Sequence, residues 1–165
     1  MQRMFSELFY PRQAVLVSAS SSEKTNLTAV EYFMPVSEKP PVVALSLHNT
    51  SLTLDLICTS MEFVVAIPSE GLNEAVLLCG TTSGKYIDKF AEARLTPMRA
   101  KRVSAPLVLE AYANLECKVL SYNSSGDHTV VVGEVLEIHP PKEEREGEPL
   151  LFNLGGKRLF GFKQH

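Results

Sequence analysis

The chain has 165 residues, of which 45% are hydrophobic and 21% are charged, and its formal net charge is −3. This length is most simply one domain, over residues 1–165, that buries about 70% of its unfolded surface. The small negative charge argues against a nucleic-acid partner, and no apolar run approaches the roughly 18 residues of a membrane span. No basic and apolar leader opens the sequence, so we expect a cytoplasmic protein without a membrane partner.

The N-terminal third of the sequence is typical of β-structure. Apolar runs predict strands over residues 14–19 and 27–34, and Pro35 is expected to end the second. The run at 42–47 is apolar at almost every position, which is typical of a strand buried on both faces.

The middle of the sequence alternates helix and strand. The Asn-Thr-Ser segment at 49–51 is a good start for a helix over 52–58. A short strand is expected over 62–67, a helix over 69–80 and a helical turn over 86–93.

The C-terminal half predicts two long strands, over 112–122 and 128–138, joined by a hairpin turn at 123–126. Residues 142–148 predict a solvated charged loop, and residues 150–162 a short terminal segment that ends in two aromatics. The fold class is therefore α+β, with a mainly antiparallel, barrel-like sheet and helices inserted between its strands.

Several standard chemistries have no support in the sequence, which lacks a dinucleotide fingerprint, a P-loop and a GxSxG motif. The cysteines have no CxxC spacing and are expected to be buried free thiols of a reducing compartment: Cys58, Cys79 and Cys117. The histidines lack metal-ligand spacing: His48, His128, a strand-end His139 and a terminal His165. No metal site is expected.

Residues 79–90 are the most distinctive segment of the chain. Gly80 and Gly84 bracket a hydroxyl-rich stretch that runs into lysines, and glycine lets a backbone approach a ligand closely. Hydroxyl groups such as that of Ser83, together with the lysines, offer donors to an anion such as a phosphate. On these residues alone, a solvated loop is the alternative.

His128 follows the predicted hairpin turn, at the mouth of the barrel-like sheet, where its side chain can reach a ligand. An ordinary surface histidine is the alternative interpretation.

Short motifs of a known family occur in order along most of the chain, from residue 10 to about 162. They are Tyr10-Pro11-Arg12, Phe33-Met34-Pro35-Val36-Ser37, Pro40-Pro41, Cys79-Gly80, Ser83-Gly84, Asp88-Lys89-Phe90, Leu95-Thr96-Pro97, Ala113-Asn114-Leu115-Glu116-Cys117, Gly126-Asp127-His128-Thr129 and Gly133-Glu134-Val135. In this order and spacing the chain resembles the flavin reductase-like family of FMN-binding split β-barrels, which includes the flavoredoxins.

The resemblance implies non-covalent FMN near a homodimer interface. The FMN phosphate would lie at Asn49, Thr50 and Ser51, where a helix start offers unpaired N–H groups and a positive dipole end. Lys89 matches a flavin-contacting lysine of the family, and Asn26 matches an asparagine that hydrogen-bonds the cofactor.

The resemblance also implies the surroundings of the isoalloxazine ring, which would lie beside the strand over 27–34. Asn26 or His128 could bond the carbonyls and nitrogens of the ring. Tyr32 stands where many relatives carry a tryptophan, and a tyrosine can still stack. Phe160 or Phe162 could cover the flavin, with core packing as the alternative for these aromatics.

The implied activity is hydride transfer from NADH or NADPH to FMN, followed by electron transfer to an acceptor that the sequence does not identify. No protein acid or base is strictly required. The alternatives are an FMN-binding electron carrier, a non-catalytic flavin-binding module and a β-barrel interaction domain without a cofactor.

Overall fold

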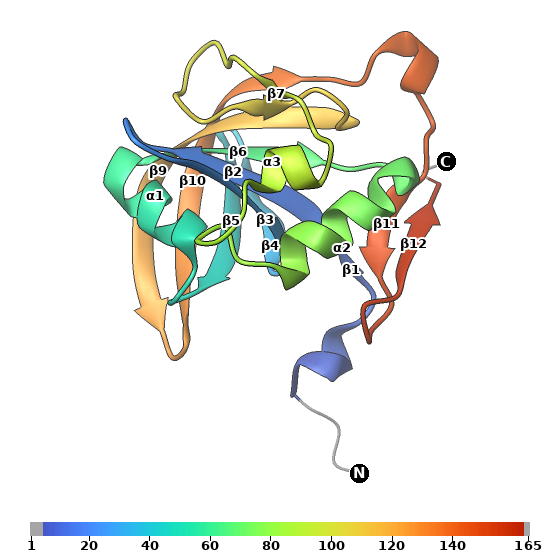
Figure 1. The fold of residues 1–165 in the computed structure, drawn as a ribbon, viewed down its shortest axis with the longest axis horizontal. Helices are drawn as coiled ribbons and strands as arrows, with labels where there is room; N and C mark the ends of the chain where they lie inside the picture. The colour runs from blue at the N-terminus through green and yellow to red at the C-terminus, as the bar shows by residue number, and fades with distance from the viewer. Residues whose placement is uncertain (1–4, 164–165) are drawn as a thin grey trace.

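The computed structural model describes residues 5–163. His165, which was interpreted as a terminal histidine without a metal-binding role, lies outside the described residues. Seven strands form one antiparallel sheet in the order β3-β2-β6-β9-β10-β5-β4 (Figure 1). These strands are β2 (Val15–Ser20), β3 (Thr25–Val30), β4 (Phe33–Glu38), β5 (Pro41–His48), β6 (Glu62–Ile67), β9 (Ala113–Ser125) and β10 (His128–His139).

The two edges of this sheet are formed by strands that are consecutive in the sequence. The chain leaves β3 at one edge, passes through Glu31 and Tyr32, and begins β4 at the other edge. No ladder joins β3 to β4 within residues 5–163, so the sheet is not closed into a barrel. The α+β prediction of a mainly antiparallel split sheet with inserted helices is confirmed.

Helices cover the sheet and bury its apolar side chains. α1 (Leu52–Ser60) packs Leu54 and Ile57 into a core cluster with Val17 of β2. α2 (Asn73–Thr81) and α3 (Lys89–Glu92) pack against Leu16 in a second cluster. Because side chains alternate along a strand, β2 contributes to a core on each of its faces.

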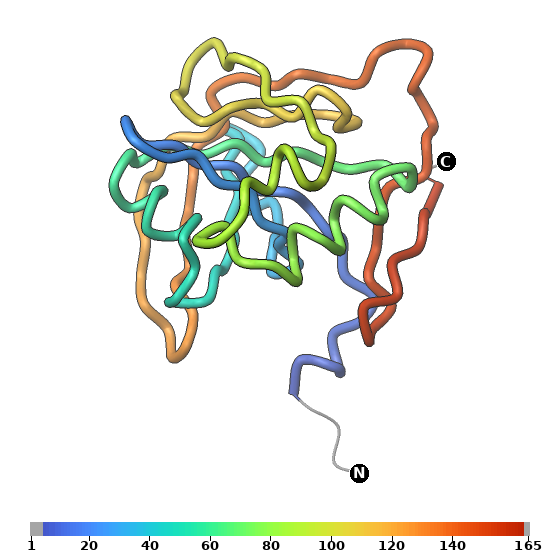
Figure 2. The backbone as a smooth tube through the Cα atoms, in the orientation of Figure 1, coloured from blue at the N-terminus to red at the C-terminus, as the bar shows by residue number. Residues whose placement is uncertain are grey.

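Smaller elements complete the fold, and the tube in Figure 2 shows the chain passing from β10 over one end of the sheet to the C-terminal hairpin. A three-stranded sheet has the order β1-β11-β12, and β7 pairs with β8. The remaining elements are β1 (Arg12–Gln13), β7 (Pro97–Met98), β8 (Leu107–Val108), β11 (Leu150–Asn153), β12 (Leu159–Phe162), η1 (Phe5–Phe9), η2 (Glu70–Leu72) and η3 (Glu143–Arg145). No helix in the described part of the chain is long and apolar enough to cross a membrane.

Most predicted strands are present, but the strand predicted over 27–34 is wrong. It is two strands, β3 and β4, and Pro35 lies inside β4 instead of ending a strand. β4 is an edge strand with an irregular register after Pro35, and such a position tolerates a residue without an N–H.

Three smaller features also differ from the predictions. β9 runs through Ser125, so the hairpin turn is Gly126 and Asp127, with Gly126 at a φ of 69°. The helical turn predicted over 86–93 is only α3. The loop at 142–148 is not fully solvated, because Arg145 is partly buried and donates to the carbonyl oxygens of Glu110 and Ala111.

Candidate functional site

An open pocket of about 390 Å³ lies between the edge strand β3 and strand β5, beside the connection through Glu31 and Tyr32. We name it the β3–β5 pocket; its lining includes Thr28 of β3, Tyr32, Ser46 of β5, Ser51 and Gly80. The volume is within the range of small-molecule sites. The space between β3 and β5 therefore provides a concave site large enough for part of a cofactor.

The start of α1 forms one end of the pocket. The Ser51 hydroxyl accepts from the N–H of Leu54 (3.5 Å) and caps the helix, as predicted. The N–H groups of Leu52 and Thr53 belong to the first helical turn, which has no intrahelical acceptors. An anion at this end would meet these groups and the positive end of the helix dipole.

The other two residues of the predicted anion cluster have different contacts. Asn49 donates to the carbonyl oxygen of Gly126 (3.0 Å) and accepts from the Thr129 hydroxyl (2.9 Å), so it fastens the β9–β10 turn. The Thr50 hydroxyl lies 2.9 Å from Nδ1 of His48. Of the three predicted residues, only Ser51 lines the pocket.

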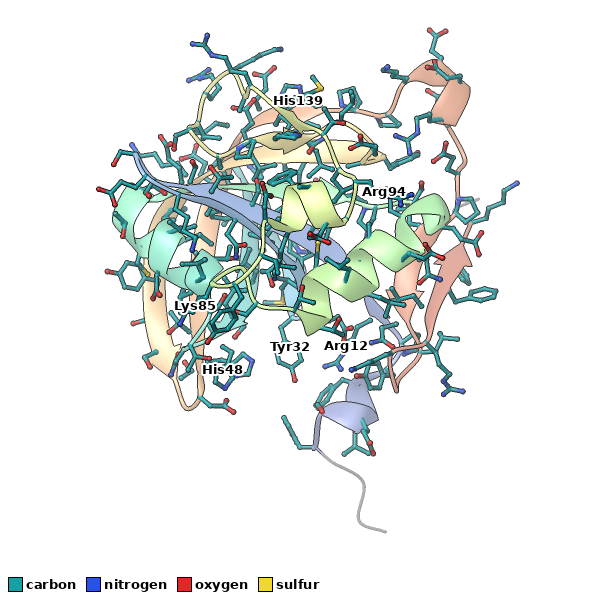
Figure 3. All side chains as sticks on the ribbon, in the orientation of Figure 1. Arg12, Tyr32, His48, Lys85, Arg94 and His139 are labelled. Carbon is teal, nitrogen blue, oxygen red and sulfur yellow. The ribbon has the colours of Figure 1, made fainter. Side chains whose placement is uncertain are left out.

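Tyr32 lies beside a partly buried arginine. The Arg12 guanidinium is 4.1 Å from the ring centroid of Tyr10 and 4.8 Å from that of Tyr32. Its Nη2 lies 3.4 Å from a carboxylate oxygen of Glu31, and its buried Nε and Nη1 have no acceptor among residues 5–163. In Figure 3, Arg12 and Tyr32 lie on the same side of the molecule as His48.

Unpaired buried donors at the wall of a pocket fit a ligand that carries acceptor atoms. Carbonyl oxygens and ring nitrogens of a flavin are acceptors of this kind, and Tyr32 is 41% exposed, so that its ring is available to a planar ligand. The pocket therefore has the N-terminus of a helix at one end and an aromatic wall.

His128 lines the pocket, in agreement with its predicted position at the mouth of the sheet. Its ring lies 5.4 Å from that of Tyr32 and 5.3 Å from that of His48, measured between centroids. Its Nδ1 donates to the Asp127 carboxylate at 2.7 Å, and this bond lowers the pKa of Asp127.

The model of the family described as "Flavin reductase like domain" matches residues 5–159. The chain belongs to this family. The resemblance inferred from the motifs is confirmed.

Named relatives of this flavin reductase-like chain include oxidoreductases. An uncharacterized protein of Archaeoglobus fulgidus is 34% identical over 87% of this chain and 80% of its own length. The flavin reductase of Pseudomonas putida is 29% identical over 89% and 82%. The NADH-dependent FAD reductase of Streptomyces globisporus is 27% identical over 97% and 84%. These relatives support an oxidoreductase.

Solved structures share the fold. The FMN-binding protein of Thermus thermophilus with bound 1-cyclohex-2-enone has a TM-score of 0.86 at 21% identity, over 100% of this chain and 94% of that one. The flavoredoxin of Desulfovibrio vulgaris has a TM-score of 0.84 at 23% identity, over 100% and 95%.

The structure corrects the environment predicted for Lys89. A flavin-contacting lysine was expected to be accessible, but Lys89 lies in α3, is 4% exposed and donates from Nζ to the carbonyl oxygen of Cys79 at 2.7 Å. Cys79 lies in the last turn of α2, whose carbonyl groups lack intrahelical donors. The ammonium group therefore caps α2 from inside the protein and is not presented to solvent.

Asn26 is also buried, and it lies behind the pocket wall. It is 4% exposed and donates from Nδ2 to the Thr53 hydroxyl at 3.0 Å. Gly84 covers it so closely that a Cβ at position 84 would overlap the Asn26 side chain. Ser83 is exposed beside Gly84, and its hydroxyl accepts from the N–H of Lys85.

The two C-terminal phenylalanines lie on β12, away from the pocket lining. Phe160 is 56% exposed and Phe162 is 61% exposed, and the Phe162 ring lies 6.0 Å from that of Phe152. The alternative role, packing in the hydrophobic core, does not account for either aromatic side chain.

Sequence reasoning gave no role to Arg12, Tyr10 or His48. Tyr10 and Arg12 carry a signal only as members of the family motif Tyr10-Pro11-Arg12. His48 becomes a pocket residue because β5 pairs with β10, and this pairing is not readable from the neighbours of His48 in the sequence.

Proposed function

We propose that this chain, as one domain over residues 1–165, binds FMN in the β3–β5 pocket. We propose further that it is an NAD(P)H-dependent flavin reductase or flavoredoxin-type oxidoreductase. The observation that carries the proposal is the pocket itself, in which the start of α1 and the aromatic wall at Tyr32 line one cavity.

The residues of the pocket divide the binding of FMN between them. Ser51 and the first N–H groups of α1 would hold the phosphate, with Thr50 and the exposed hydroxyl of Ser83 near this end of the site. Tyr32 would contact the ring, and His128 would bond to its polar edge. Bound FMN supplies the redox chemistry, whereas the chain binds, orients and shields it.

Lys89, Asn26 and Asn49 would act on the cofactor indirectly. Lys89 holds the carbonyl of Cys79, next to the pocket residue Gly80, and Asn26 fixes Thr53 in the first turn of α1. We expect each of them to position the pocket wall.

A homodimer is the proposed assembly. An apolar hollow of about 570 Å³ shares Arg12 and Tyr32 with the pocket and includes Phe9 and Met34, which are 55% and 59% exposed. A second copy on this face would bury these side chains next to the flavin. Phe160 or Phe162 could then cover the flavin of the other copy, because both rings face outward.

Anaerobic titration of the FMN-loaded protein with NADH and NADPH tests the reductase. Loss of the oxidised flavin absorbance with either nucleotide at a catalytically useful rate supports it. The alternative, an FMN-binding electron carrier, is favoured by the fold shared with a flavoredoxin. Reduction by dithionite but by neither nucleotide would overturn the reductase and leave the carrier or a non-catalytic flavin-binding module.

A further inference from the structure

A second open pocket, of about 550 Å³, lies at the start of β3. Three segments form it, namely the turn between β2 and β3, the segment between α2 and α3, and residues 97–106; we name it the Tyr86 pocket. Its volume is within the range of small-molecule sites, and Ile87, Pro97 and Pro106 give it apolar walls. It has no lining residue in common with the β3–β5 pocket, so it is distinct from the proposed flavin site.

Tyr86 presents an uncovered aromatic ring in this pocket. The residue is 86% exposed, more than any other large hydrophobic residue of the described part of the chain. The backbone beneath it is held in a turn, because the N–H of Tyr86 donates to the carbonyl oxygen of Ser83 at 3.1 Å and the N–H of Lys85 donates to the Ser83 hydroxyl at 3.3 Å. A planar ligand can therefore stack on a ring whose backbone is already in place.

Two lysines from different segments line the same pocket. Lys24 lies in the turn between β2 and β3, and Lys85 precedes Tyr86. Both are exposed, and neither ammonium group has an ion-pair partner among residues 5–163. Unpaired ammonium groups are donors for the oxygens of a phosphate. The pocket therefore combines a stacking surface with two cations that the chain itself does not neutralise.

Two carboxylates also line the pocket, and only one of them is used by the fold. Asp88 accepts from the N–H groups of Phe90 (3.0 Å) and Ala91 (3.2 Å), so it caps the start of α3. Glu23 is exposed, and within the described residues no hydrogen bond or ion pair engages its carboxylate. A carboxylate accepts from hydroxyl groups, such as those of a ribose.

We infer that the Tyr86 pocket binds a nucleoside phosphate, with the base on Tyr86, the phosphate at Lys24 and Lys85, and the ribose at Glu23. This inference goes beyond the proposed function, because the Tyr86 pocket and the β3–β5 pocket share no residue. The same chemistry belongs to a free mononucleotide and to the adenosine half of a dinucleotide such as NADH or FAD.

The test compares AMP with adenosine, which has the same base and sugar but no phosphate. Each is titrated into the purified protein and followed by saturation-transfer NMR. Wild type is expected to bind AMP more tightly than adenosine. Tyr86→Ala should weaken binding of both about fivefold or more, because base stacking is lost, whereas Tyr86→Phe keeps the ring and should retain the affinity. Combining Lys24→Ala with Lys85→Ala should remove the preference for AMP.

Control variants change the same residue types outside the pocket. Tyr122→Ala and Lys118→Ala replace an exposed tyrosine and an exposed lysine of β9, and both should leave AMP affinity unchanged. Failure of the folded wild type to bind AMP would overturn the inference. Equal AMP affinity in wild type, Tyr86→Ala and the double lysine variant would also overturn it.

Titrations with larger ligands identify the source of the nucleotide. For the adenosine half of FAD, FAD should bind more tightly than FMN, and Tyr86→Ala should remove the difference. For NADH, Tyr86→Ala should weaken NADH binding and leave FAD and FMN alike. For a free nucleotide, only AMP binding should respond to Tyr86→Ala. Failure of FMN to bind while AMP still binds would contradict the proposed function and leave this inference standing.

Discussion

The Nζ atom of Lys89 donates a 2.7 Å hydrogen bond to the carbonyl oxygen of Cys79, ten residues earlier in the chain. This contact joins α3 to the last turn of α2 and fixes the backbone next to Gly80, which lines the β3–β5 pocket. Burial lowers the pKa of Lys89, with the neighbouring Cys79 opposing this shift. The lysine that a family motif identifies therefore acts on the pocket through the protein interior.

Lys89→Met introduces an apolar side chain of similar length and removes the donor that Lys89 provides to the Cys79 carbonyl. Because a buried acceptor is left unpaired, the free energy of unfolding should fall by about 1–3 kcal/mol. FMN affinity should fall with it. Urea denaturation measures the first effect. Lys85→Met, at an exposed position in the same segment, is the control and should stay within about 0.5 kcal/mol of wild type. Equal stability of both variants would refute the buried role.

Ser51→Ala removes the cap of α1 and a hydroxyl from the proposed phosphate site. The lost cap should cost about 1 kcal/mol of stability. FMN affinity should fall, whereas affinity for riboflavin, which has no phosphate, should change little. Fluorescence titration with both flavins makes the comparison within one variant. A parallel loss for FMN and riboflavin would place the phosphate elsewhere.

Gly84→Ala places a Cβ against the Asn26 side chain, which must then leave its bond to Thr53. Such overpacking should destabilise the chain by about 1–3 kcal/mol. Gly71→Ala is the matched control, because nothing lies within 4 Å of a Cβ at that position. Thermal unfolding of the two variants measures the difference. If the two substitutions have the same effect, Gly84 does not close over Asn26.

The contacts of Glu116 predict that the folded protein loses stability at acid pH. Its carboxylate is buried, accepts from the N–H groups of Lys101, Arg102 and Val103, and lies 2.7 Å from Nε2 of His139. Burial alone would raise its pKa, but the backbone N–H groups of Lys101 and Arg102, together with His139, outweigh it, so the pKa of Glu116 is lowered.

A carboxyl group whose pKa is lower in the folded state than in the unfolded state stabilises the fold at any pH above its unfolded-state pKa. This stabilisation is lost as the pH falls from the unfolded-state pKa to the folded-state pKa. Wild type should therefore lose stability below about pH 4.3. Glu116→Gln should be less stable at pH 7, and its stability should depend less on pH in the acid range. Urea unfolding across this range measures both slopes. Parallel pH profiles would show that Glu116 does not contribute.

The motifs and apolar runs of the sequence were enough to predict the family and most of the sheet. The buried runs of β2, β5 and β6 are visible because their apolar residues are continuous and bounded by turn residues. The break between β3 and β4 was missed, because Glu31 and Tyr32 interrupt an apolar stretch by only two residues while the chain moves to the opposite edge of the sheet.

The predicted site was less complete than the predicted fold, for reasons of tertiary structure. The burial of Lys89 depends on how α3 packs, and the motif around it reads the same for an exposed or a buried lysine. The stacking of Arg12 on Tyr10 and Tyr32, and the pairing of His48 with His128, join segments that are distant in sequence. Ser51 and His128 had a local signal, a helix cap and a position beside a turn, whereas Tyr32 came from the family resemblance; all three line the pocket.

Equilibrium titration of the dialysed protein with FMN, followed by visible absorbance and flavin fluorescence, tests most directly whether the β3–β5 pocket binds FMN. We expect a saturable spectral shift with one FMN per chain and weaker binding in Ser51→Ala and Tyr32→Ala. Failure of FMN to bind the folded wild-type protein, or unchanged affinity in both variants, would contradict it.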